Sequence, residues 1–278
     1  MIGQQLRSEL WKLFGKKRTY IGFGMLLAAQ LLVTLVFRYS HASRGAVRAL
    51  ETNGYPAEPY LSGLTIAVVM LFPIAYILLP LYLALVGGDL VAKEAEDGTL
   101  RMILSRPIGR GRLLAVKWVA GVIFAVLLVG LLGVFGLALA SLFFPWGGLF
   151  AFVPGELFTV LEPGPGLRRY ALAHVMLGAK AVTVTSLAFM FSCFNVKPAA
   201  ATILALSVLF VNAILMQIPF FRDLQPWFLT YHLNLWQQML AEPIPWWRVA
   251  ESFSLLAGFN ATFLALGFAA FQVRDFKS

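Results

Sequence analysis

The chain has 278 residues, of which 60% are hydrophobic and only 13% are charged, and its formal net charge is +9. A soluble domain carries roughly 25% charged residues to cover its surface, so this composition excludes a chain that faces water throughout and indicates a membrane protein. The positive charge is typical of the Lys and Arg residues that fix membrane orientation, and no basic surface interleaved with aromatic residues points to nucleic acid.

The first 19 residues have an amphipathic pattern, because Leu6, Leu10, Leu13 and Phe14 recur at helical spacing among polar residues. This pattern predicts an interfacial helix over residues 1–19 on the inner membrane surface. A solvated extension is the simpler alternative. A signal peptide is not expected, since the charges alternate with apolar residues and no cleavage site follows.

Six apolar runs follow, and each is close to or above the roughly 20 residues that a helix needs to cross the hydrocarbon core. The runs are continuous, whereas the strands of a membrane barrel alternate apolar and polar residues. We therefore predict an all-α polytopic integral membrane protein that forms a single transmembrane domain over residues 1–278. Its spans are expected at about 20–37, 61–86, 118–144, 170–194, 198–221 and 249–271.

The distribution of positive charge predicts the orientation. With the N-terminus in the cytoplasm, residues 1–19, 87–117, 195–197 and 272–278 form the inner side and hold most of the Lys and Arg residues. Both termini are therefore expected in the cytoplasm and the chain in the inner membrane of the cell.

Two connections on the predicted outer side have unusual compositions. Residues 145–169 contain repeated Pro and Gly, which break helices. Residues 222–248 are rich in Trp and Tyr, and a helix between Pro226 and Pro243 would dip into the bilayer from outside. An interfacial aromatic belt is an equally good interpretation. If the segment forms an outer gate for substrate, the gate residues are expected to be Trp227, Phe228 and Tyr231.

The longest polar connection on the inner side is residues 87–117, which begin with acidic residues and end with basic ones. Within them, Leu100, Ile103 and Leu104 fall on one face of a short helix that Pro107 ends. A short helix held below the membrane is suited to docking another protein. The alternative is an ordinary charged loop that only fixes topology.

The order of an acidic pair, Gly-Thr-Leu, Leu-Ser-Arg-Pro, Arg and Lys in this loop resembles the cytoplasmic loop of ABC type-2 exporter permeases. Residues 189–203 are similar to the short inner hairpin of that family, and the number of spans and the N-terminal helix agree as well. The loop positions that match are Glu94, Glu96, Gly98, Thr99, Leu100, Leu104, Ser105, Pro107, Arg110 and Lys117.

The resemblance implies a permease subunit, not an enzyme, that forms a homodimer and binds two cytoplasmic ABC ATPase subunits. It also implies that the loop forms a coupling helix in a groove of the ATPase. The expected ATPase-coupling residues are Glu94, Glu96, Gly98, Thr99, Leu100, Ile103, Leu104, Ser105, Pro107 and Arg110. The sequence contains no GxxxxGK[ST] phosphate-binding loop, so ATP and Mg are expected on the partner ATPase and no cofactor on this chain.

Other chemistry has little support in the sequence. The three histidines are far apart and form no zinc or catalytic motif, so neither a metal site nor catalytic residues are expected. Lys180, inside the fourth span, either lines a translocation path, pairs with an acid such as Glu251, or lies near the outer interface. An ion-gradient-driven secondary transporter is the alternative function, although it would need paired ionisable groups inside the spans.

Overall fold

The computed structural model describes residues 2–105, 108–153, 155 and 157–274, with only the backbone at Leu104. Within this part of the chain, six helical segments are long and apolar enough to cross a membrane, which confirms the all-α polytopic fold. The segments are α2 (Lys17–Tyr39), the run α4–η1–α5 (Gly63–Glu96), α7 (Arg110–Phe143), α8 (Pro163–Cys193), α9 (Pro198–Gln217) and α12 (Trp246–Val273).

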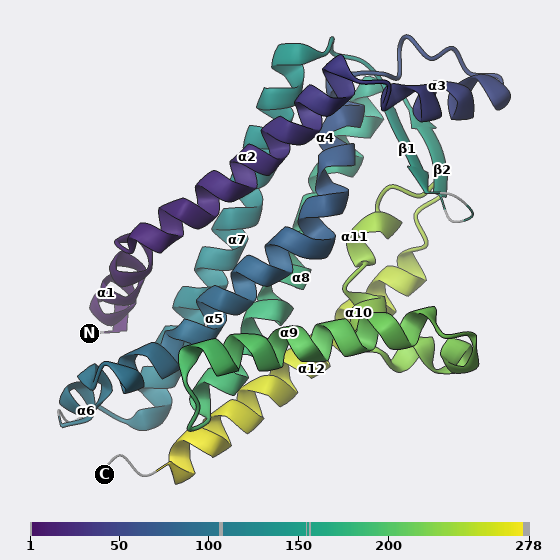
Figure 1. The fold of residues 1–278 in the computed structure, drawn as a ribbon. Coiled ribbons are helices and arrows are strands. Elements are labelled where there is room, and N and C mark those ends of the chain that lie inside the picture. The colour runs from purple at the N-terminus through teal and green to yellow at the C-terminus, as the bar shows by residue number, and fades with distance from the viewer. Residues whose placement is uncertain (1, 106–107, 154, 156, 275–278) are drawn as a thin grey trace.

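The bundle is arranged around α8, which contacts α5, α7, α9 and α12 and is the most enclosed of the six segments (Figure 1). The helices α2, α9 and α12 lie at the periphery and expose apolar side chains. Helix α2 shows the inverted pattern of a lipid-facing helix, because Gln30 and Thr34 are buried while Ile21 and Leu32 are exposed. The buried Gln30 donates from Nε2 to the carbonyl of Leu132 at 2.9 Å, so its amide N–H group has a partner inside the bundle.

The second span is one continuous helical run with a π-helical turn in its middle. Helix α4 (Gly63–Pro73) leads into η1 (Ile74–Leu78), and α5 (Leu79–Glu96) follows without interruption. A π-turn inside an α-helix is rare and occurs frequently at functional sites.

The helix of this span continues ten residues past residue 86, the predicted end of the span. Gly87 and Gly88 do not end the helix but allow α5 to approach its neighbours closely. A Cβ atom at Gly87 would lie 2.8 Å from the Thr185 carbonyl on α8, and one at Gly88 would lie 2.7 Å from Thr202 Oγ1 on α9. Small residues at such crossings are typical of packed membrane helices.

Two further helices are also longer than the predicted spans. Helix α7 begins at Arg110, eight residues before the predicted span, and α8 begins at Pro163, seven residues before it. Proline suits the first turn of a helix, where its missing N–H has no partner, so the run that looked like a helix breaker starts α8. The inner connection between the second and third spans therefore shrinks from residues 87–117 to residues 97–109.

The connections hold short elements that the sequence analysis missed or misplaced. Helix α3 (Ser43–Thr52) follows α2, and residues 145–169 contain an antiparallel hairpin of β1 (Leu149–Val153) and β2 (Leu157–Leu161). The single helix predicted between Pro226 and Pro243 is wrong. That segment begins at the end of the 3₁₀ helix η2 (Pro219–Trp227) and contains the short helices α10 (Leu229–His232) and α11 (Leu235–Gln238).

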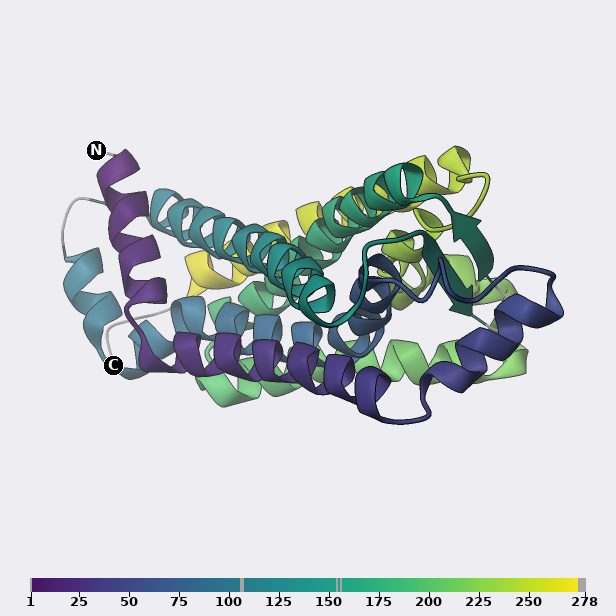
Figure 2. The ribbon, with the colours of Figure 1, turned by 90° about the horizontal axis from the view of Figure 1, so that it is seen from above.

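The two ends of the bundle differ. Helix α1 (Ile2–Phe14) and the C-terminal end of α12 lie at the same end of the bundle as α6 (Thr99–Leu104), whereas α3 and the hairpin lie at the other end (Figures 1 and 2). This arrangement agrees with the predicted grouping of the termini with the loop on one side of the membrane.

Candidate functional site

The candidate site is the end of the bundle where α6 projects below α5. Helix α5 ends at Glu96, and the chain turns through Gly98, whose φ of 72° lies in the left-handed region that glycine adopts without strain. The N–H of Asp97 donates to the carbonyl of Lys93 at 2.9 Å and closes the last turn of α5. The Gly-Thr-Leu signature thus marks the corner between α5 and α6.

Helix α6 is oriented differently from the prediction. Leu100 is only 1% exposed and belongs to the hydrophobic core, and Ile103 packs partly against the same core. The side chains of Leu100 and Ile103 therefore pack inward, because the core offers them more burial than solvent does. The outer face carries Arg101, Met102 and Ser105, with Met102 65% exposed.

Two of the predicted coupling residues cannot be placed in the same detail. Only the backbone of Leu104 is described, at the last position of α6, and Pro107 lies outside the described residues.

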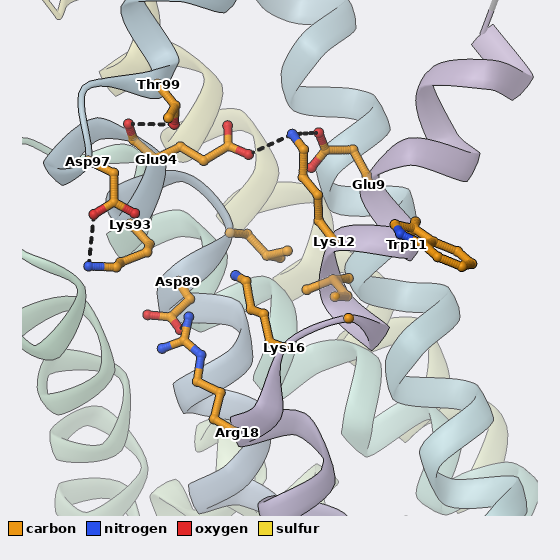
Figure 3. Close-up of a pocket in the computed structure, with 13 residues that line it drawn as sticks. Glu9, Trp11, Lys12, Lys16, Arg18, Asp89, Lys93, Glu94, Asp97 and Thr99 are labelled. Atoms are coloured by element: carbon orange, nitrogen blue, oxygen red, sulfur yellow. Dashed lines mark hydrogen bonds and ion pairs between the residues drawn. The ribbon is translucent and has the colours of Figure 1, made fainter.

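Helix α1 (Ile2–Phe14) confirms the predicted N-terminal helix and packs against α7. The buried Lys117 of α7 lies 2.8 Å from Glu9 Oε2 and 2.7 Å from Glu94 Oε2, while Lys12 lies 2.8 Å from Glu9 Oε1 and 3.0 Å from Glu94 Oε1. Figure 3 shows the Lys12 side chain between these two carboxylates. Two lysines and two glutamates therefore join α1, α5 and α7.

The electrostatics of α1 favour the charged forms of this cluster. Burial opposes ionisation of Glu9, but the attraction of Lys117 and Lys12 outweighs it and holds the pKa of Glu9 below its ordinary value. Burial likewise opposes protonation of Lys12, yet its hydrogen bonds and attraction to Glu9 and Glu94 raise the pKa of Lys12. Since each charge has two partners, removal of one group leaves a buried charge behind.

Glu94, predicted as a polar contact for the ATPase, is thus engaged inside the chain. Glu96 is exposed and pairs with Lys93 at 2.9 Å, so it stays accessible. Thr99 donates from Oγ1 to the Glu94 carbonyl at 3.2 Å, and exposed Ser105 donates to the Met102 carbonyl. Glu96, Thr99 and Ser105 therefore lie at or near the corner between α5 and α6, where Thr99 and Ser105 bond to backbone carbonyls.

Arg110 has a bracing role as well. Its Nη1 donates to the carbonyl of Gln272 at 2.8 Å and to that of Arg274 at 3.2 Å. These contacts fasten the start of α7 to the end of α12, so the Arg110 guanidinium is directed toward the chain's own C-terminal segment.

A cavity of about 600 Å³ lies between α1, α5 and α6. Trp11 points away from the charged cluster on the outer side of α1, and it is 80% exposed (Figure 3). Burial and the repulsion of Arg18 lower the pKa of Lys16, whereas Arg18 itself pairs with Asp89. The charged residues that line the cavity are four acids and four bases, namely Glu9, Asp89, Glu94, Asp97, Lys12, Lys16, Arg18 and Lys93.

A second and smaller groove of about 390 Å³ lies between α1, α6 and the start of α7, and Met102 and Ile103 line it. The cavity and this groove share Glu9, Lys12 and Thr99 in their linings. Such a polar, hollowed surface with a few exposed apolar atoms is suited to docking a protein.

The predicted outer gate residues follow one another at the end of η2 and in α10. Trp227 is 74% exposed at the end of η2, Phe228 contacts the Phe221 ring at a centroid distance of 6.3 Å, and Tyr231 lies beside His232. The interpretation of this segment as an interfacial belt is wrong for Trp236, which is fully buried and packs edge-on against Phe72.

The sequence analysis missed the roles of Glu9, Lys12 and Lys117. Glu9 and Lys12 belong to the polar residues of the amphipathic N-terminal segment, and Lys117 is predicted only as a position that matches the family loop. The available signal was an acid on the first amphipathic helix and a base just inside an apolar span, where a lone charge is costly.

Comparisons with known proteins agree with this architecture. Residues 14–242 match the family model described as ABC-2 family transporter protein. The uncharacterized protein YhcI of Bacillus subtilis (strain 168) is 26% identical over 207 residues, a region that covers 72% of this chain. The chain spans 65% of the length of that relative. Because the family model covers most of the six-span bundle, the chain belongs to the ABC-2 family of transporter proteins.

Proposed function

We propose that this chain is the permease subunit of an ATP-driven exporter, and that it works as a homodimer with two ABC ATPase subunits bound at the α6 end. The observation that carries the proposal is the linkage of α6 to the spans. Helix α6 follows directly on a helical run that starts at Gly63, and Leu100 anchors it in the core. A displacement of α6 by the ATPase would therefore be transmitted along the second span.

The orientation follows from charge. The end that carries α1, α6 and the C-terminal end of α12 holds most of the Lys and Arg residues of the inter-span segments, and such segments stay on the cytoplasmic side. In this proposal the ATPase contact lies in the cytoplasm of the cell and the bundle lies in its inner membrane. The partner would bind ATP and Mg, since this sequence has no phosphate-binding loop.

The contact surface is the outer face of α6. Arg101, Met102 and Ser105 are exposed there, and methionine adapts its shape well to partner surfaces. Glu96 adds an exposed acid at the corner. The ion cluster of Lys117 and Glu9 does not face the partner in this proposal; it holds α1 against α5 and α7 so that the three helices move together.

A role for the outer segment completes the transport cycle. Trp227 is exposed at the end of η2, which follows the end of α9 that lies away from α6 (Figure 1). In this proposal substrate leaves the protein there. Trp227→Ala should therefore change substrate-stimulated ATP hydrolysis without loss of assembly. Unchanged export would leave Trp227 as a membrane anchor.

The proposal is tested by Met102→Asp in cells that also produce the ATPase subunit. A small interface depends on a few residues, so this charge should lower ATPase co-purification by about tenfold or more, which corresponds to about 1.4 kcal/mol. Asn195→Asp is the matched control, because Asn195 is exposed at the connection between α8 and α9 and receives the same charge. Equal recovery of the ATPase with both variants would contradict the docking role of α6.

A further inference from the structure

Lys180 of α8 is buried inside a membrane span without a compensating acid. Its exposure is 4%, and no carboxylate in the described part of the chain forms an ion pair with it. Glu251, the acid considered from the sequence, is exposed and does not pair with it. An uncompensated ammonium is expensive in hydrocarbon, and intramembrane lysines usually face a cavity or a substrate path.

The cavity that Lys180 faces lies between α5, α9 and α10 and has a volume of about 390 Å³. This volume falls within the usual range of small-molecule sites, roughly 300–1,000 Å³. Most of the lining is apolar, and it includes Ile77 and Phe210, which are both 63% exposed at the surface of the bundle. The cavity is thus open sideways, toward the acyl chains of the bilayer, as well as inward to Lys180.

The polar part of the lining is organised around the π-turn. Lys180 Nζ lies 5.2 Å from the centre of the Tyr76 ring, which belongs to η1. Gln237 donates from Nε2 to Tyr76 Oη at 2.8 Å and so fixes the position of the ring. The ring face offers the ammonium only a weak attraction, which a bound anion would greatly exceed. The π-turn and the lone cation are independent features that meet at the same cavity.

We propose that this cavity binds an anionic amphiphile, with its carboxylate or phosphate on Lys180 Nζ and its apolar chain along α5 and α9, and that such molecules are the substrate class of the exporter. The assignment of such molecules as substrates rests on the proposed function, whereas their binding in this cavity does not. The same chemistry could come from a resident phospholipid, and the two sources differ in whether the ligand stimulates ATP hydrolysis.

The binding test uses the purified permease in phosphatidylcholine nanodiscs and a diazirine-labelled palmitate as the photoreactive probe. Lys180→Met keeps an unbranched side chain, one atom shorter, and removes its charge. Replacing an unpaired buried charge with an apolar group should preserve the fold. We expect palmitate labelling of η1 and α9 peptides to fall about tenfold in Lys180→Met and to persist in Lys180→Arg.

Two controls make the result specific. Lys197→Met removes an exposed lysine between α8 and α9 and should label like the unaltered protein. The corresponding diazirine-labelled alcohol, which has no charge, should label the unaltered protein and Lys180→Met equally. Palmitate labelling that is unchanged by Lys180→Met would overturn the proposed site.

The substrate assignment is tested with the permease–ATPase complex. Palmitate should stimulate ATP hydrolysis at least twofold in the unaltered complex and should not do so with Lys180→Met. Labelling without stimulation would overturn the substrate assignment and identify a resident lipid. Failure of the ATPase to associate at all would contradict the proposed function instead, and the labelling result on the permease alone would still stand.

Discussion

Lys117 of α7 and Glu9 of α1 form a buried ion pair with an N–O distance of 2.8 Å, across 108 positions of sequence. Glu94 lies 2.7 Å from the same ammonium, so one lysine joins the N-terminal helix, the second span and the third span. This relationship makes α1 a structural part of the bundle at its α6 end.

Replacement of this lysine should be costly. Lys117→Met leaves the buried carboxylates of Glu9 and Glu94 with less compensation, and removal of one partner of a buried pair costs about 3–5 kcal/mol. Thermal unfolding of the purified protein in detergent should show a clearly lower midpoint. Lys93→Met is the control, because Lys93 forms only exposed pairs, and it should leave the midpoint unchanged. Equal midpoints for both variants would show that the cluster adds nothing to stability.

Acid should loosen α1. Since the pKa of Glu9 is lowered in the folded protein, the contribution of its carboxylate is present in full above the ordinary value of 4.5 and is lost as the pH falls through the lowered value. Spin labels at Gly3 and Gly109 should report a broader distance distribution below pH 4.5. In Glu9→Gln the distribution should already be broad at neutral pH, and it should not change with acid. A narrow distribution at every pH would contradict this role of Glu9.

The close crossing of α5 and α8 predicts a steric effect at Gly87. A Cβ atom there meets a backbone carbonyl of α8 at 2.8 Å, so Gly87→Ala must shift a helix, and such overpacking costs about 1–3 kcal/mol. Gly24→Ala is the matched control, because a Cβ at Gly24 meets nothing within 4 Å. Detergent stability should fall only for Gly87→Ala, and an equal response would mean that α5 and α8 are not so close.

The sequence predicted the parts of the fold that depend on local composition. Six spans and α1 followed from apolar runs and helical spacing, and α6 followed from its apolar face. The end of α5 could not be predicted, because Gly87 and Gly88 break helices in water but permit close packing in a membrane. The direction of Leu100 and the partners of Glu94 depend on which distant helices approach, and a single sequence does not reveal this.

The arrangement of the two ends predicts cysteine accessibility. In a Cys193→Ser background, which has no other cysteine, single cysteines at Arg44, Gly164 and Glu242 should react in intact cells with a membrane-impermeant maleimide. A cysteine at Gly109 should react only after the cells are opened. Labelling of Gly109 in intact cells would reverse the orientation.

Photo-crosslinking from α6 tests the central claim most directly. A benzoylphenylalanine at Met102, on the exposed face of α6, should give a covalent adduct with the ATPase subunit on irradiation of cells that produce both chains. The same group at Arg44 on α3, at the opposite end of the bundle, should give none. An adduct from Arg44 but not from Met102 would contradict the assignment of α6 as the element that contacts the ATPase.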